Sequence, residues 1–262
     1  MKRYLKLYWE FFKNCLVREM EFRAHFIFSN LVSLSWALLF ILTFILIYQH
    51  VDTVNGWARP QVLLLLAVYF LADRIFDTFF EINFANFVSL VNSGELDLVL
   101  TKPASGQFIV SLRYLSLSFL VSVIAMLALI VYLIKTYFWP VSMINLLVFI
   151  FLIVIGITIS YALWFMTLLP VFWWGRVENI NHLFRSFHQL ARIPLDLTGP
   201  ILRPLLTYLL PLMFIATVPV KSITGAISWP LAFFGLFAAA LLLWLSGRAW
   251  RFALRHYTSA SS

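Results

Sequence analysis

The sequence predicts an all-α integral membrane protein with six transmembrane helices, an N-terminal interfacial amphipathic helix and one polar cytoplasmic segment after the second span. Two observations predict this class. Hydrophobic residues make up 63% of the 262 residues and charged residues only 11%, whereas a soluble domain is typically about half apolar and about a quarter charged. A soluble fold of this length has too little interior to bury so much apolar surface. The apolar residues also fall in long runs, with basic residues near the ends of those runs.

The first stretch of the chain, residues 1–24, has the pattern of a helix lying in the membrane interface. Apolar residues recur at helical spacing, and charged residues fall on the opposite side. The apolar side comprises Leu5, Tyr8, Trp9, Phe12 and Leu16, and the charged side comprises Lys2, Arg3, Lys6, Glu10 and Lys13. The alternative is a simple basic anchor that marks the cytoplasmic side of the first span. No small-residue cleavage site follows the first apolar run, so we expect this stretch and the first span to be retained.

Six later segments are long and apolar enough to cross a bilayer, whose hydrocarbon core takes about 20 residues of helix. Each is predicted to be helical because hydrocarbon offers no partner to an unpaired backbone amide. The six segments are 26–48, 60–80, 108–134, 141–168, 201–218 and 229–247. We therefore expect one transmembrane domain over residues 1–262, with spans one to three in 26–134, spans four to six in 141–247 and a cytoplasmic tail over 248–262.

The positions of lysine and arginine predict the orientation. Most of these 19 residues lie in the N-terminal stretch, in the loops after spans two and four, or in the C-terminal tail. Only Arg59, Lys135 and Lys221 lie on the other side, and Arg74 lies within the second span. Because loops rich in lysine and arginine stay in the cytoplasm, both termini are predicted to be cytoplasmic. The net charge of +8 then indicates contact with anionic membrane lipids rather than nucleic acid.

The long polar break over residues 83–107 contains a short helix signal, a few apolar residues between a glycine and a Lys-Pro stop. Leu96, Val99 and Leu100 would share one apolar face on this helix. An apolar face in the cytoplasm, with no lipid beside it, favours a protein partner. The alternative is a short helix folded back on its own bundle. The segment comprises Gly94, Glu95, Leu96, Asp97, Leu98, Val99, Leu100, Thr101, Lys102 and Pro103.

A second surface helix is predicted over residues 177–192, where Leu183, Phe184 and Phe187 belong to an apolar stripe opposite polar residues. Several prolines follow within and around the fifth span. Proline removes a helical hydrogen bond and clashes with the preceding turn, so this span is expected to be kinked or broken. A broken span often lines a pathway, because its freed carbonyls need a cavity or a neighbour; irregular packing is the alternative.

The one polar cluster inside a span lies in the second: Asp73, Arg74, Asp77 and Glu81. The three carboxylates are spaced i, i+4, i+8 and share a helix face, and Arg74 reaches Asp77 at i+3. Charges within a span normally face the bundle interior or water. The cluster is predicted either to line a pathway near its inner mouth or to form a solvated helix end with a structural ion pair.

Known catalytic and nucleotide-binding motifs are absent from the sequence. There is no Walker A sequence, no dinucleotide fingerprint, no His-Glu-x-x-His and no Gly-x-Ser-x-Gly. The five histidines are scattered, and Cys15 is the only cysteine. We therefore predict no catalytic residue, no metal site and no cofactor in this chain.

Two stretches resemble the membrane subunits of ATP-binding-cassette transporters of the type-2, or export-type, permease family. The first is the glycine-to-proline segment, which looks like the branch with Gly-x-Leu-Asp-x-x-Leu-x-Arg/Lys-Pro after the second span; lysine stands here where arginine is commoner. The second is the C-terminus, where a Gly-Arg pair precedes an aromatic-basic helix and Tyr-x-Ser-Ala-Ser. The matching positions are Gly94, Leu96, Asp97, Leu100, Lys102 and Pro103, then Gly247, Arg248, Trp250, Arg251, Tyr257, Ser259, Ala260 and Ser261.

The resemblance implies that this chain is the transmembrane subunit of an exporter in a bacterial cytoplasmic (inner) membrane. In that family two permease subunits, identical or homologous, form the substrate pathway, and a separate cytoplasmic ATPase binds ATP and Mg. The segment after the second span docks on that ATPase, which makes it the coupling segment. The residues expected to couple the two are Leu96, Asp97, Val99, Leu100 and Lys102, flanked by Gly94, Glu95 and Pro103.

Two other classes of function compete with this interpretation. An ion-coupled secondary transporter or channel without an ATPase would typically show internal repeats and buried ion-binding carboxylates. No convincing repeat relates the two halves of the sequence, and the one carboxylate cluster lies towards the cytoplasmic end of its span. An intramembrane enzyme or assembly scaffold is the other possibility, but no paired catalytic groups converge at one depth.

Overall fold

The computed structural model describes residues 2–21, 23–175 and 178–257, and most of this chain is helical. Four helical stretches are long and apolar enough to cross a membrane: Phe26–Ile47, Leu117–Phe138, Met143–Trp174 and Trp229–Leu254. They correspond to predicted spans one, three, four and six. They contain most of α2 (Arg23–Ile47) and all of α7 (Leu120–Leu133), α8 (Met143–Leu168), α9 (Val171–Trp174) and α13 (Trp229–Leu254).

Predicted span two is a helix that lies in the centre of the bundle. The helix α3 (Arg59–Phe76) continues through a π-helical turn, η1 (Asp77–Glu81), into α4 (Ile82–Asn92). Residues 64–69 are fully buried, and α3 contacts α2, α7, α8 and α12 (Thr217–Ile223). A helix shielded by its neighbours can carry charges that lipid would exclude. Its 18 residues include Arg59, Asp73 and Arg74, which is why it falls outside the four apolar spans.

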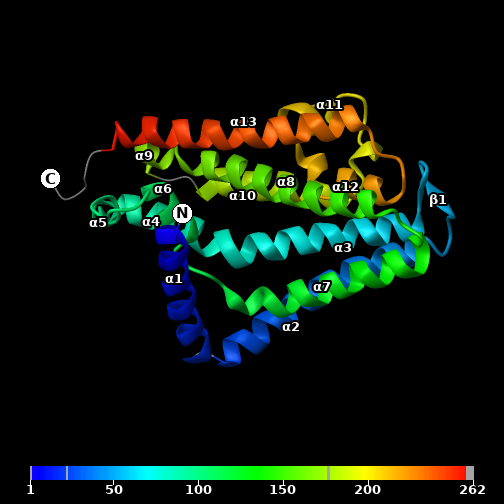
Figure 1. Ribbon diagram of the computed structural model, residues 1–262, viewed down its shortest axis with the longest axis horizontal. Coiled ribbons are helices and arrows are strands. Elements are labelled where there is room, and N and C mark those ends of the chain that lie inside the picture. Colours follow the sequence, from blue (N-terminus) through cyan, green and yellow to red (C-terminus); the bar gives the residue numbers. More distant parts are fainter. Residues whose placement is uncertain (1, 22, 176–177, 258–262) are drawn as a thin grey trace.

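Predicted span five is not one helix, so the expected count of six spans is not confirmed. The region forms four short pieces: α11 (Leu202–Pro204), η6 (Leu205–Leu209), η7 (Leu212–Phe214) and α12. Pro204, Pro211 and Pro219 lie at or within these pieces, and each lacks the amide that an uninterrupted helix would use. Proline therefore breaks this span, as expected, and the pieces gather at one end of the bundle (Figure 1).

The helix predicted on the surface, α10 (Glu178–Gln189), packs one face against the bundle. Its Phe184 and His188 are buried, and the ring of Phe184 lies 5.3 Å from that of Trp164 on α8. Two short helical turns, η4 (Leu190–Arg192) and η5 (Leu195–Leu197), continue it towards the broken span. The predicted surface helix is therefore present: Leu183 on α10 is 58% exposed, and its apolar stripe packs against a neighbouring helix.

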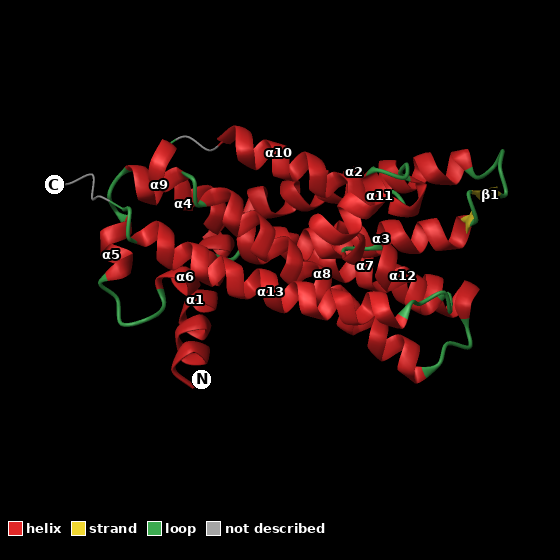
Figure 2. Ribbon diagram, turned by 90° about the horizontal axis from the view of Figure 1, so that it is seen from above, coloured by secondary structure: helices red, strands yellow, loops and turns green. Residues whose placement is uncertain are grey.

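The long helices run side by side along the molecule, and the connecting segments gather at its two ends (Figures 1 and 2). One end holds α5 (Leu96–Leu100), α6 (Gly106–Leu112), α9 and the last described residues of the chain. The other holds a hairpin of β1 (Thr53–Val54) and β2 (Trp57–Ala58). Asn55 and Gly56 turn this hairpin with φ angles of 47° and 82°, the left-handed backbone that such tight turns need.

The helix α1 (Lys2–Glu21) lies across the bundle rather than along it (Figure 1). Its Cys15 is buried against Leu115 and Leu117, where the chain passes from α6 to η2 (Leu117–Phe119). The Sγ atom of Cys15 accepts a hydrogen bond from the amide of Leu115 at 3.2 Å, and Arg18 donates one to the carbonyl of Leu115 at 3.1 Å. The N-terminal stretch is therefore helical, as predicted, and its place in the membrane interface stays a prediction. The helix supplies hydrogen-bond partners to the backbone of Leu115.

Candidate functional site

The predicted coupling segment forms a short helix at one tip of the molecule. Gly94 ends the preceding turn with φ of 77°, a conformation that glycine adopts without steric cost. The helix α5 follows over Leu96–Leu100, and Ser105 caps the next helix, α6, by accepting a hydrogen bond from the amide of Phe108. The amide of Ser105 donates to the hydroxyl of Tyr4 on α1 at 3.1 Å. The N-terminal helix thus braces the return from this segment.

Only part of the predicted docking face is exposed. Leu96 and Val99 are almost fully buried in the bundle of this same chain. Leu98 is 68% exposed and Leu100 is 37% exposed. Leu96 and Val99 therefore fit the alternative of a short helix folded back on its own bundle, and only Leu100 of the predicted apolar face is exposed. The exposed surface of the segment comprises Glu95, Leu98, Leu100, Thr101, Lys102 and Pro103.

The charged cluster predicted in span two lies mostly inside the bundle, whereas its last residue, Glu81, is 36% exposed. One guanidinium nitrogen of Arg74 lies 2.8 Å from a carboxylate oxygen of Asp73, and the other lies 2.9 Å from one of Asp77. The predicted Arg74–Asp77 ion pair is therefore present. The Asp77 side chain is 8% exposed and that of Arg74 is 17% exposed. Buried charges of this kind are tolerated only when they are paired.

Residues of α10 complete this cluster. Arg185 forms an ion pair with Glu81, and its guanidinium lies 4.8 Å from the ring centre of Trp164. His188 is buried, and its Nδ1 lies 3.9 Å from an oxygen of Asp73. The contact between His188 and Asp73 depends on how α10 packs beside α3, which the local sequence pattern does not show. For the contact between Arg185 and Glu81, the only signal in the sequence was a charged residue, Arg185, on the polar side of the α10 stripe.

Two neighbouring cavities surround the cluster. The smaller, of about 270 Å³, is lined by Asp73, Asp77, Glu81 and residues of α10. The larger, of about 760 Å³, lies between α2, α3 and the end of α10. Arg74, Phe119, Gln189 and Arg192 line both. The larger cavity falls within the range of about 300–1,000 Å³ that binds small molecules in proteins.

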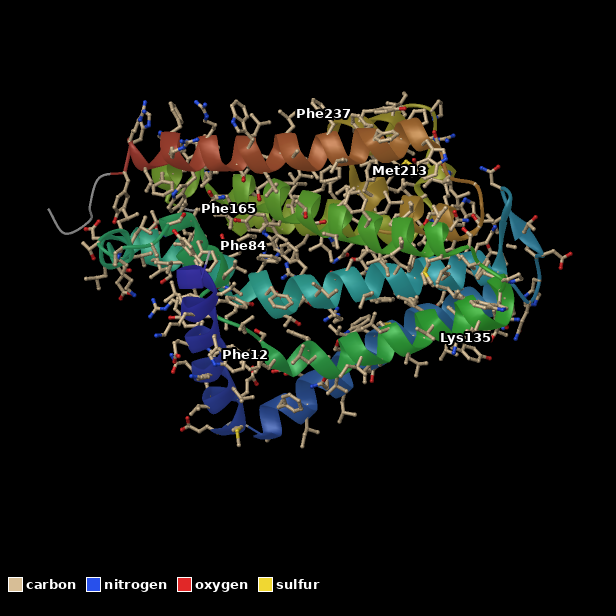
Figure 3. All side chains as sticks on the ribbon, in the orientation of Figure 1. Phe12, Phe84, Lys135, Phe165, Met213 and Phe237 are labelled. Carbon is tan, nitrogen blue, oxygen red and sulfur yellow. The ribbon has the colours of Figure 1, made fainter. Side chains whose placement is uncertain are left out.

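An aromatic core separates the charged cluster from the tip that carries α5. The rings of Phe84 on α4 and Phe165 on α8 lie 5.9 Å apart between their helices (Figure 3). Trp250 on α13 packs against Phe165 at 5.8 Å and against Phe87 at 5.9 Å. Trp250 also limits the space beside Gly106, which follows the coupling segment. Packed side chains therefore connect the tip of the molecule to the helices that hold the charges.

The comparisons with known proteins give one match. The model of a family described as ABC-2 family transporter protein matches residues 34–261. This range includes the coupling segment, the charged cluster and both cavities apart from the first residues of α2. No curated protein and no solved structure gave a significant match. The end of the C-terminal motif, Ser259, Ala260 and Ser261, falls outside the described part of the chain.

Proposed function

The chain belongs to the ABC-2 transporter family, a family of multi-pass membrane proteins, and from that premise we propose that it is the membrane-spanning subunit of an ATP-binding-cassette exporter. Two such subunits, identical or homologous, form the pathway, and a separate cytoplasmic ATPase powers it by binding ATP and Mg. The carrying observation is the family match over most of the chain. The absence of a nucleotide-binding motif from the sequence agrees with a separate ATPase.

The exposed residues of the coupling segment support the proposal that the ATPase docks at this tip of the molecule. Leu98 is a large apolar side chain that is exposed there, and the charged residues Glu95 and Lys102 flank it. An exposed leucine flanked by two charges of opposite sign is suited to bind in a groove on a partner protein. The last described residues lie at the same end of the bundle (Figure 1), which the excess of lysine and arginine assigns to the cytoplasm.

The test is purification of the chain with the ATPase encoded beside it. We expect Leu98→Asp to lower the amount of co-purified ATPase, and the ATP hydrolysis stimulated by the chain, about tenfold, because a buried unpaired carboxylate costs more than 1.4 kcal/mol. Val51→Asp is the matched control, since Val51 is also exposed but follows α2 at the opposite end.

Three results would count against the proposal. Failure of the unmodified chain to bind or stimulate any ATPase encoded beside it would remove the exporter assignment. An unchanged Leu98→Asp variant would remove α5 as the docking element. Transport driven by an ion gradient in liposomes without ATP would favour a secondary transporter or channel instead.

A further inference from the structure

The larger cavity has an uneven distribution of charge. Its described lining is mostly aromatic and apolar, with two serines and one glutamine. The charged residues among them are Arg74 and Arg192, and no carboxylate lines this cavity. The carboxylates of the cluster face the smaller cavity instead. The lining comprises Phe28, Ser29, Val32, Ser33, Trp36, Phe40, Phe70, Arg74, Phe119, Gln189 and Arg192.

The two arginines differ in how far their charge is neutralised. Arg74 contacts both Asp73 and Asp77 within 3 Å, so its charge is already paired. Arg192 forms no ion pair within 4.0 Å with any described residue. Its Nε is buried without a hydrogen-bond partner in the part of the chain that the structure describes. Such a group costs free energy unless a ligand or water satisfies it.

Aromatic rings hold the Arg192 guanidinium in place. Its central carbon lies 5.0 Å from the ring centre of Phe40 on α2 and 5.4 Å from that of Tyr69 on α3. Cation–π contacts of this kind orient a guanidinium but leave its edge able to donate hydrogen bonds to an anion. Arg192 is thus a fixed donor fork at the boundary of an aromatic cavity.

We propose that the larger cavity binds an amphiphile with an anionic group on Arg192 and an aromatic or aliphatic body against Phe28, Trp36 and Phe119. This inference rests on the proposed function, since it names the class of substrate that the exporter would accept. A guanidinium fork matches carboxylate, sulfonate and phosphate oxygens in two parallel hydrogen bonds. The volume of about 760 Å³ accommodates a molecule of drug size.

Binding to the chain alone tests the site without the ATPase, so its failure is distinct from failure of the exporter assignment. The full chain is placed in nanodiscs of neutral phosphatidylcholine, and empty nanodiscs supply the background. The anionic probe is 8-anilino-1-naphthalenesulfonate, and N-phenyl-1-naphthylamine is its uncharged counterpart. We expect Arg192→Gln to raise the Kd of the anionic probe at least about tenfold, the factor for one lost charge-assisted hydrogen bond, and to leave the Kd of the uncharged probe unchanged.

Two further variants separate charge from folding. Arg192→Lys keeps the charge but loses the planar fork, so its Kd for the anionic probe should lie between those of the unmodified chain and Arg192→Gln. Arg248→Gln is the matched control, because Arg248 on α13 also stacks on an aromatic ring, that of Trp244 at 4.8 Å, but lies outside the cavity. If Arg192→Gln fails to elute as a single folded species, Ser29→Asp adds a carboxylate to the lining and should weaken the anionic probe alone.

The outcomes are decisive in both directions. Equal loss of both probes, or no loss of the anionic probe in a folded Arg192→Gln or Ser29→Asp variant, would overturn the proposal. Nanodiscs that contain phosphatidylglycerol show whether a lipid headgroup occupies the site. If this lipid raises the Kd of the anionic probe more for the unmodified chain than for Arg192→Gln, the natural occupant is a lipid headgroup. If it changes the Kd equally for both chains, the occupant is a free amphiphile, and either result keeps the anionic site.

Discussion

Arg74 organises the charged cluster, because its guanidinium contacts two carboxylates that precede and follow it on the same helix. Its distances to Asp73 and Asp77 are 2.8 Å and 2.9 Å. Glu81, one turn beyond Asp77, pairs instead with Arg185 on α10. The i, i+4, i+8 spacing in the sequence was sufficient to predict a shared face and the Arg74–Asp77 pair. It contained no information about Arg185, because that contact joins positions 104 residues apart.

Asp77→Asn is expected to leave the protein folded and to lower transport several-fold at equal expression. Arg74 keeps Asp73 as its partner, so the variant leaves no uncompensated arginine in the bundle. Transport falls if the cluster lines the pathway, because the charge beside the cavity changes. Glu10→Gln is the matched control: it also converts a carboxylate to an amide, but in an exposed ion pair with Lys13. Unchanged transport by Asp77→Asn would make the cluster purely structural.

At the scale of elements, the broken fifth span is held between α8 and α13 by close contacts at two glycines. A Cβ atom at Gly156 on α8 would lie 2.2 Å from the carbonyl oxygen of Phe214. A Cβ atom at Gly235 on α13 would lie 2.2 Å from the ring of the same residue. Phe214 is itself fully buried. Small residues at these positions let the broken segment approach both helices, as they do where membrane helices pack closely.

Gly156→Ala and Gly235→Ala should both destabilise the protein, by about 1–3 kcal/mol or more for an overpacked core position. The two should respond differently to Phe214→Leu. The smaller side chain removes ring atoms that crowd Gly235, so it should partly rescue Gly235→Ala. It leaves the backbone carbonyl that crowds Gly156, so it should not rescue Gly156→Ala. Thermal unfolding in detergent measures all three effects.

The control for this pair is Gly199→Ala, since nothing lies within 4 Å of a Cβ atom at Gly199. Equal rescue of both glycine variants by Phe214→Leu would show that the ring, and not the backbone, sets the distance at Gly156. No destabilisation by either variant would mean that the broken segment is not held between these helices.

The prolines of this region made a break in the helix predictable, but they did not show where the broken pieces would pack. Pro204, Pro211 and Pro219 act on their own local backbone, and that effect can be read from sequence alone. The fit of Phe214 between Gly156 and Gly235 depends on three segments far apart in the chain. The same limit explains α10, whose apolar stripe identified a helix but not the aromatic surface of α8 that it covers.

At the scale of the whole molecule, the apolar helices have the length that a bilayer requires. The helix α13 has 26 residues, which at 1.5 Å per residue is about 39 Å, and the hydrocarbon core is about 30 Å thick. Its outer surface is apolar as well: Phe237 points away from the bundle (Figure 3) and is 62% exposed. Composition was sufficient to predict a membrane bundle, because exposed apolar surface on this scale is stable only in lipid.

The two ends of the bundle should lie on opposite sides of the membrane, with α5 inside the cell and the β hairpin outside. Lysine and arginine concentrate on the side assigned to the α5 end, and such loops remain in the cytoplasm. The structure places α5 and the hairpin at opposite ends of the long helices (Figure 1). Asp52, beside the hairpin, and Thr101, which follows α5, are both exposed.

A membrane-impermeant maleimide applied to intact cells tests this orientation. Asp52→Cys should be labelled, and Thr101→Cys should be labelled only after the cells are permeabilised, because a charged reagent does not cross the hydrocarbon core. The background is low, since Cys15 is the only native cysteine and is 4% exposed. A Cys15→Ser version of both variants removes it entirely. Labelling of Thr101→Cys in intact cells would reverse the orientation and would place α5 where no cytoplasmic ATPase can reach it.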